Sequence, residues 1–339
     1  MADVLALSVF GVDWQLLKPF IVIGLAFGGV YALSGVGLVV LYRATGVLNL
    51  AFGAIGAAGA LIAYWLLNHT SCPEWLAFTV CVLFGGVLNL AYGEIAVFGA
   101  IVVSQVMDRG APTLVAAGVG MLAAAALSVL LDLTLMRPVY RQTGEERTLL
   151  GLLLTLGVAF VIVGLLNWKY PTGALYIFVG GDPISIAGVP MAAGSVWASL
   201  ITLGVAGVLL VFFGLTTFGR GVRSVIQDET GARLVGISPS LVRTLIFALS
   251  GGLAGLVAVT RSMSAPLTVT AGFDLTTFAL IVAVVGGLGS VAGAFLAGVL
   301  LGIVDNVSAH YIGEYITAIV LLAAAAITIL VRPRGLLGR

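Results

Sequence analysis

Apolar runs about twenty residues long recur through this chain, and no other sequence feature constrains the fold as strongly. Of the 339 residues, 61% are hydrophobic and 9% are charged, whereas a soluble domain is about 25% charged. An apolar helix can cross a bilayer because it satisfies its own backbone hydrogen bonds. We therefore predict an all-α fold, a polytopic helical membrane protein in which residues 1–339 form one transmembrane domain.

The runs predict about eight to ten transmembrane helices, some of them broken or re-entrant. The candidate spans cover 17–42, 50–68, 76–106, 113–136, 148–168, 194–217, 240–264, 275–304 and 314–331. Glycines at Gly286–Ser290 interrupt the run at 275–304, which predicts either two short crossings or a re-entrant pair.

Basic residues orient these spans. They gather in the loop at 137–147, in the loop at 218–239 and in the C-terminal tail from Arg332. The positive-inside rule places all three in the cytoplasm. An even number of crossings must then separate the second loop from the tail. The connection at 169–193, with one lysine and several aromatic residues, is expected to be an external loop.

The segment Gly219–Ser238 is the longest stretch dense in charge. It is too polar for hydrocarbon, where one central charge costs roughly 2.5–3.5 kcal/mol or more. Val222, Val225 and Ile226 fall on one helical face, so we expect an apolar stripe suited to a groove in a partner protein.

Two short helical pieces are predicted within this segment. We expect Gly231 to break the first and Gly236 to end the second. Ser238 is then the N-cap of the following span, and Pro239 occupies its first helical position.

An internal repeat lies near the N-terminus. Gly46–Gly53 recurs as Gly86–Gly93 with one aromatic exchange, forty residues later. Only one period is present, so 46–85 and 86–125 are interpreted as a local duplication rather than a solenoid.

Several polar or glycine positions within the apolar runs are candidates for a substrate pathway. For Asn49 and Asn89 the alternative is an interhelical hydrogen bond, worth roughly 0.6–2 kcal/mol. Glu94 is an intramembrane carboxylate, and such a group is a functional candidate by default, although Ala54 replaces it in the first copy. The other candidates are Gly286, Gly287, Gly289 and Ser290.

Other classes of protein find little support. Cys72, Cys81, His69 and His310 are the only cysteines and histidines, so we expect no metal site. No nucleophile with a base and an orienting group is recognisable, and no catalytic residues are predicted. The near-neutral net charge of +1 argues against nucleic-acid binding. No P-loop is present, so any ATP must be bound by another chain.

The chain resembles the permease subunits of bacterial ABC importers for branched-chain amino acids, the LivH type, over almost its whole length. The positions that carry the resemblance are Tyr31–Leu33, Gly46–Gly53, Arg137-Pro138, the GR-x-x-R-x-x-x-x-D-x-x-x-A-x-x-x-GI pattern, the GGLGS-x-x-G segment and Arg332–Leu336.

The resemblance implies a function and a set of partners. It implies translocation of branched-chain or related amino acids across the bacterial inner membrane, with the C-terminus cytoplasmic and no cofactor on this chain. Implied partners are two cytoplasmic ATPase subunits, a second permease subunit and an external solute-binding protein. The charged loop would be the coupling segment, with matching positions at Gly219, Arg220, Arg223, Asp228, Ala232, Gly236 and Ile237.

One departure from the family leaves a question open. The family has a single Asn-Leu-Ala-x-Gly element, whereas this chain has two, at Asn49 and Asn89. The first follows the expected lead-in, and the second carries the Gly93-Glu94 pair. Two alternatives to the importer also remain: a channel or ion-coupled carrier for an amide or urea that needs no partner and uses Glu94, and a chain that the duplication has disabled.

Overall fold

The computed structural model describes residues 14–45, 91–142, 144–170, 174–177, 181–268 and 271–337. Helices dominate these residues, and the strands are only two or three residues long, which confirms the all-α prediction. The helices are α1 Trp14–Thr45, α4 Tyr92–Met107, α5 Thr113–Leu131, the π-helix η2 Asp132–Met136, α6 Arg137–Val139, α7 Gly144–Lys169, α8 Ala193–Leu215, α9 Thr217–Gln227, α10 Glu229–Leu234, α11 Pro239–Ser264, α12 Gly272–Gly286, α13 Val291–Ile312 and α14 Glu314–Val331.

Five of these helical stretches are long and apolar enough to cross a membrane. They cover Leu17–Tyr42, Thr113–Val139, Ala193–Leu215, Pro239–Ser264 and Val291–Ile312, and each overlaps a predicted span, although the last extends beyond residue 304. Shorter apolar helices lie at Leu154–Lys169, Gly272–Gly286 and Ile316–Val331. A multi-pass membrane protein is the architecture that these lengths support.

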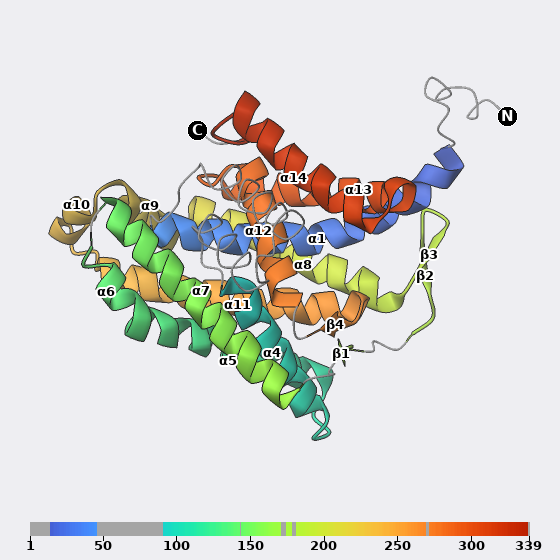
Figure 1. The fold of residues 1–339 in the computed structure, drawn as a ribbon, viewed down its shortest axis with the longest axis horizontal. Coiled ribbons are helices and arrows are strands. Elements are labelled where there is room, and N and C mark those ends of the chain that lie inside the picture. Colours follow the sequence, from blue (N-terminus) through green and yellow to red (C-terminus); the bar gives the residue numbers. More distant parts are fainter. Residues whose placement is uncertain are drawn as a thin grey trace, which may run out of the picture.

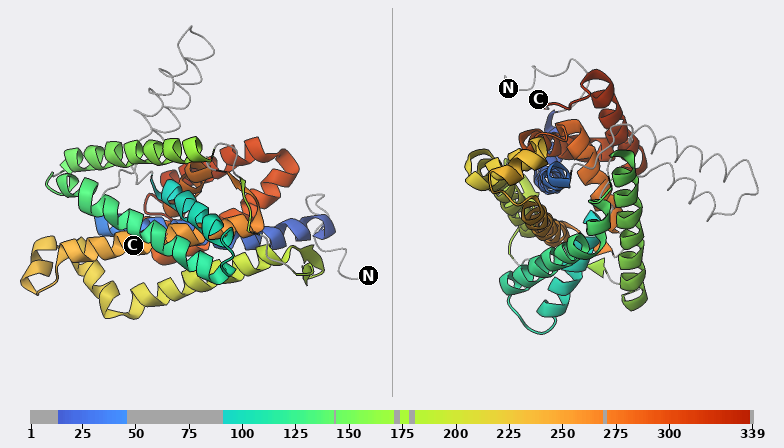
Figure 2. Two further views of the ribbon diagram at one scale, coloured as in Figure 1. Left: turned by 90° about the horizontal axis from the view of Figure 1, so that it is seen from below. Right: turned by 90° about the vertical axis from the view of Figure 1, so that its left-hand side faces the viewer.

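Helix α1 crosses the middle of the bundle and contacts α8, α11, α12 and α13 (Figures 1 and 2). Its closest neighbour is α13, because glycines on both helices let the two backbones touch. A Cβ on Gly302 would collide with the backbone of Gly28, and one on Gly298 would collide with Ala32. Small residues thus fix the central pair of helices.

A second group of helices, α4, α5 and α11, packs beside this centre. A Cβ on Gly120 of α5 would lie 2.6 Å from the carbonyl oxygen of Gly99 on α4. A Cβ on Gly255 of α11 would meet Ala124 of α5 at 3.0 Å. Small residues therefore let α4 and α11 pack closely against α5, as they do for α1 and α13.

The apolar run at 275–304 belongs to two helices, α12 and α13, so the glycines mark a turn between helices. Gly287 has a φ of +98°, a conformation that glycine adopts without strain. Ser290 then caps α13 by accepting a hydrogen bond from the Gly293 amide at 2.9 Å. Helices α11 to α14 supply the even number of segments that the orientation argument requires.

The connection at 169–193 carries the small strands. Strands β2 Ile184–Ile186 and β3 Val189–Met191 form an antiparallel hairpin, and β1 Ala174–Leu175 pairs with β4 Leu267–Thr268. Figure 1 shows the β2–β3 hairpin and the α9–α10 pair at opposite ends of the molecule.

Candidate functional site

Charged side chains gather at both ends of α11. Arg243 lies near its start and Arg261 near its end, which puts them about 27 Å apart at a rise of 1.5 Å per residue. The first region contains helices α9 and α10, which we call the α9–α10 segment, and the residues of neighbouring helices that contact them. We call the second the Arg261 cluster, defined by Phe27, Tyr31, Glu94, Arg261, Asp274, Phe278 and Asp305.

The α9–α10 segment has the two-helix form expected from the sequence, but the position of the break differs. Asp228 separates the helices, with a φ of −153°, and its carboxylate caps α10 by accepting a hydrogen bond from the Thr230 amide at 2.9 Å. Gly231 lies inside α10, so the expectation that it breaks the helix was wrong. An aspartate at an N-cap stops one helix and starts the next.

The predicted ending of this segment is confirmed. Gly236 follows α10 with a φ of +83°, a value that a residue with a Cβ rarely adopts. Ser238 caps α11 through the Leu241 amide at 3.5 Å, and Pro239 is the first helical residue.

The apolar stripe faces this chain's own core rather than a partner's groove. Val222 is 4% exposed and Val225 is 7% exposed, while Ile226 lies at the surface. The exposed hydrophobic residues are instead Leu234, the last residue of α10, and Val235, which follows it, at 84% and 74% exposure. The sequence interpretation chose the wrong face because burial inside the chain and burial by a partner give the same pattern.

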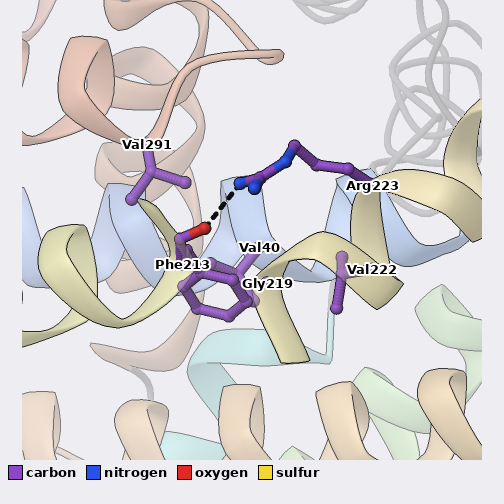
Figure 3. A pocket seen from close by; sticks show the side chains of 6 residues that line it. All are labelled: Val40, Phe213, Gly219, Val222, Arg223 and Val291. Carbon is purple, nitrogen blue, oxygen red and sulfur yellow. Dashed lines mark hydrogen bonds between the residues drawn. The ribbon is translucent and has the colours of Figure 1, made fainter. Parts of the chain in front are cut away.

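Arg223 ties the segment to the preceding helix. Its guanidinium donates a hydrogen bond of 2.6 Å to the backbone carbonyl of Phe213 on α8 (Figure 3). The bond crosses a small hollow of about 240 Å³, including the space open to solvent. Val40, Gly219, Val222 and Val291 line the remainder of that hollow, so α1 and α13 also reach it.

Glu229 joins α10 to α11 through two arginines. Its Oε1 accepts hydrogen bonds from Arg233 at 2.7 Å and from Arg243 at 3.2 Å. Partial burial by itself would raise the pKa of Glu229, but the hydrogen bonds and charges of Arg243 and Arg233 outweigh it and lower that pKa. Arg243 also lies 4.4 Å from the ring centre of Tyr140, a cation–π contact.

Asp132 completes this network. Its carboxylate accepts hydrogen bonds from Tyr140 at 2.8 Å and from Thr244 at 2.6 Å, so it links the end of α5 to α11. Every charged group in this network therefore has a partner.

The Arg261 cluster differs because its arginine forms no ion pair with a described residue, whereas Arg243 pairs with Glu229 and only its Nε is buried without a hydrogen-bond partner. Arg261 lies inside a candidate membrane span, with its guanidinium carbon 5.5 Å from the ring centre of Phe27. Its Nη1 is buried and has no hydrogen-bond partner among the described residues. Asp274 and Asp305 lie close enough for the charge of Arg261 to act on them, yet neither forms an ion pair with it.

Asp305 is held by an aromatic residue on another helix. The Tyr31 hydroxyl of α1 donates a hydrogen bond of 2.8 Å to Oδ2 of Asp305 on α13. The Tyr31 ring stacks on Phe278 of α12, with 4.8 Å between centroids. The partner of Asp305 therefore comes from a helix that is remote in sequence.

Glu94 extends the cluster toward α4. The side chain is 3% exposed, and its Oε2 has no hydrogen-bond partner among the described residues. Close packing surrounds it, because a Cβ on Gly272 would collide with the Glu94 carboxylate. The neighbouring Gly93 amide donates a hydrogen bond of 2.8 Å to the Thr276 hydroxyl, so the start of α4 is fixed against α12.

The other predicted pathway residues lie elsewhere. Asn49 and Asn89, with the first copy of the repeat, lie outside the described residues. The turn Gly286–Ser290 packs against the C-terminal tail, where the Leu336 amide donates a hydrogen bond of 2.9 Å to the carbonyl of Val285. Its role in a pathway stays a prediction.

Sequence reasoning missed Arg261, although a signal was present. An arginine within the apolar run at 240–264 is an intramembrane charge and merits the same attention as Glu94. Within the described ranges, no group of three or more histidine, cysteine or acidic side chains is placed to hold a metal ion.

Comparison with known proteins gives a consistent family. A family described as "Branched-chain amino acid transport system / permease component" matches residues 75–331. The chain is 26% identical over 334 residues to the high-affinity branched-chain amino acid transport system permease protein BraD of Pseudomonas aeruginosa, covering 93% of this chain and 94% of that protein. It is 25% identical over 328 residues to the corresponding protein LivH of Escherichia coli, with the same coverage. The ribose import permease protein RbsC of Haemophilus influenzae is 26% identical over 221 residues, covering 55% of this chain and 64% of that protein.

Proposed function

This chain belongs to the branched-chain amino acid transport permease family, and from that premise we propose that it moves branched-chain or related amino acids across the bacterial inner membrane. It is a multi-pass permease, and its relatives are transport proteins rather than enzymes. The observation that carries the proposal is the match over 75–331, supported by two relatives that align over nearly their full length.

We propose that the transport is powered by other chains. The partners are two cytoplasmic ATPase subunits that bind the ATP, a second permease subunit, homologous or identical, and an external solute-binding protein. The basic loops and the arginine-containing tail support a cytoplasmic C-terminus. The β2–β3 hairpin, at the opposite end of the helices from α9–α10, would then face the binding protein.

The α9–α10 segment is the proposed contact with the ATPase. Leu234 and Val235 offer an exposed apolar tip, which is the kind of surface that docks on another protein. Movement of this tip would reach α8 through Arg223 and α11 through Glu229 and Arg243. The remaining proposed coupling positions are Gly219, Arg220, Asp228, Ala232, Gly236 and Ile237.

We propose that the second copy of the repeat, with Asn89 and Glu94, occupies the family's position beside the substrate path. Two observations support this choice. The family match begins at residue 75 and so includes only the second copy. The second copy also leads directly into α4, whose Gly93 and Glu94 pack against α12. Asn49 and the Gly286–Ser290 turn remain candidates with less support.

The function is tested in proteoliposomes that contain this chain with its partner permease and ATPases. We expect uptake of radiolabelled L-leucine that requires both ATP and the solute-binding protein. Uptake of amide, urea or amino acid by this chain alone, without ATP, would overturn the proposal in favour of the carrier. Failure of the complete wild-type complex to transport any branched-chain amino acid would overturn the proposed substrate class.

A further inference from the structure

We propose that the Arg261 cluster is a transient binding site for the charged backbone groups of the transported amino acid. In this site Arg261 binds the α-carboxylate, Asp305 and Asp274 bind the α-ammonium group, and the aromatic rings contact the side chain. The inference rests on the proposed function and extends it by naming the residues that recognise the substrate inside the bundle.

The unmet hydrogen-bonding capacity of Arg261 is the first support. A guanidinium presents planar donors that match a carboxylate with two parallel hydrogen bonds. A charge within a membrane span is expensive unless it is paired, so it is retained for a function by default. Here Nη1 is buried with no partner among the described residues. In the proposed site, a substrate carboxylate is the partner that the described residues do not provide.

The acidic residues are the second support. Asp305 uses Oδ2 for the Tyr31 hydroxyl, which leaves Oδ1 without a hydrogen bond from the described residues. Asp274 lies on the exposed first turn of α12. Both carboxylates lie within electrostatic reach of Arg261 without closing an ion pair. An amino acid carries one positive and one negative group, so it can bind the guanidinium with its carboxylate and an aspartate with its ammonium group at the same time.

The aromatic residues are the third support. The ring centre of Phe27 lies 5.5 Å from the Arg261 guanidinium. Tyr31 lies one helix turn after Phe27 on α1, and its ring stacks on Phe278, which lies one turn after Asp274 on α12. These rings offer apolar surface beside the charged groups, and a branched aliphatic side chain would bury itself against them. The cluster draws on α1, α11, α12 and α13, and ligand sites in helical bundles are commonly built between facing helices.

Arg243, on the same helix, shows what a structural arginine looks like in this chain. It has an ion pair with Glu229 at 3.2 Å and a cation–π contact with Tyr140 at 4.4 Å, although its Nε, like Nη1 of Arg261, is buried without a hydrogen-bond partner among the described residues. Arg261 has the aromatic contact but no ion pair. The contrast argues that the missing partner of Arg261 is a ligand.

The test measures the initial rate of L-leucine uptake in the reconstituted complex at several concentrations of loaded binding protein. Arg261→Gln should lower the maximal rate at least tenfold, and Arg261→Lys should lower it less because the charge remains. Arg109→Gln, an arginine exposed outside the cluster, is the matched control and should transport normally. ATP hydrolysis without binding protein should be unchanged in all three variants.

A double variant separates recognition from architecture. If Arg261 only balances the charge of Asp305, then Arg261→Gln combined with Asp305→Asn should recover transport; if both bind substrate, the double variant stays at least as impaired as the worse single one. Tyr31→Phe removes the hydroxyl that donates to Asp305, so its uptake rate shows whether Asp305 needs this hydrogen bond for transport. Normal uptake by Arg261→Gln, or recovery in the double variant, would overturn the inference. Absence of uptake by the wild-type complex would instead overturn the proposed function.

Discussion

The two ends of α11 treat charge in opposite ways. Around Arg243 the charges are matched: Glu229 accepts from two arginines, and Asp132 accepts from Tyr140 and Thr244. Each arginine has one buried nitrogen without a hydrogen-bond partner among the described residues, Nε of Arg243 and Nη1 of Arg261, but only Arg261 also lacks an ion pair with these residues. An arginine in an ion pair is held by its partner, whereas an arginine without an ion pair can still bind the carboxylate of a ligand. We propose that this difference separates a region that couples to the ATPase from a region that binds substrate.

The largest expected effect compares the two arginines directly. Arg243→Met should destabilise the folded chain by about 1–3 kcal/mol, because it breaks a partly buried ion pair and leaves Glu229 with one partner. Arg261→Met should leave stability unchanged or raise it by about 1–2 kcal/mol, because it removes a guanidinium that has no ion pair and whose Nη1 is buried without a hydrogen-bond partner among the described residues. Thermal unfolding followed by size-exclusion chromatography in detergent measures both. Equal destabilisation by the two substitutions would break the comparison.

A second comparison concerns the two apolar faces of the α9–α10 segment. Val222→Ala removes a buried side chain and should cost about 1–3 kcal/mol of stability. Leu234→Ala, at a site 84% exposed, should change stability by less than about 0.5 kcal/mol. Leu234→Ala should nevertheless weaken co-purification of the ATPase subunits. If it affected stability and left ATPase binding intact, the proposed docking tip would lie elsewhere.

The smallest effect is the pH dependence contributed by Glu229. Its pKa is lower in the folded chain than in the unfolded one, so its stabilising contribution is complete above the unfolded value of about 4.3. The contribution is lost as the pH falls through the folded pKa. Because the site is partly exposed, we expect less than about 1 kcal/mol. Thermal unfolding of wild type and Glu229→Gln between pH 3.5 and about pH 7 measures it, and the two curves should converge at the acidic end.

Much of the architecture could be predicted because local rules suffice for it. The lengths of the apolar runs predicted the positions of α1, α8 and α11. The residues Gly236, Ser238 and Pro239 predicted where α11 begins. The orientation argument required an extra helix, which proved to be the division into α12 and α13. The break at Asp228 was missed because an aspartate cap competes with a glycine as a helix breaker, and sequence alone did not rank them.

The candidate sites could be predicted less well. Glu94 was recognised because it is the only charged residue in its apolar run, whereas Arg261, which shares the run 240–264 with Arg243, was overlooked. Asp305 and Tyr31 are 274 residues apart in sequence. No local pattern predicts that these two side chains meet, since their contact depends on how closely α1 and α13 approach.

The sequence by itself determined that the chain is a helical membrane protein, where its main helices lie and to which family it belongs. These properties follow from hydrophobic length, helix caps and short motifs, all of which act within one segment. Only the tertiary structure decided which charges are paired. Glu229 and Arg243 meet across α10 and α11, while Arg261 and the carboxylates near it do not meet. Pairing depends on distances of a few ångströms between different helices, and those distances are set by the packing of small residues along their faces.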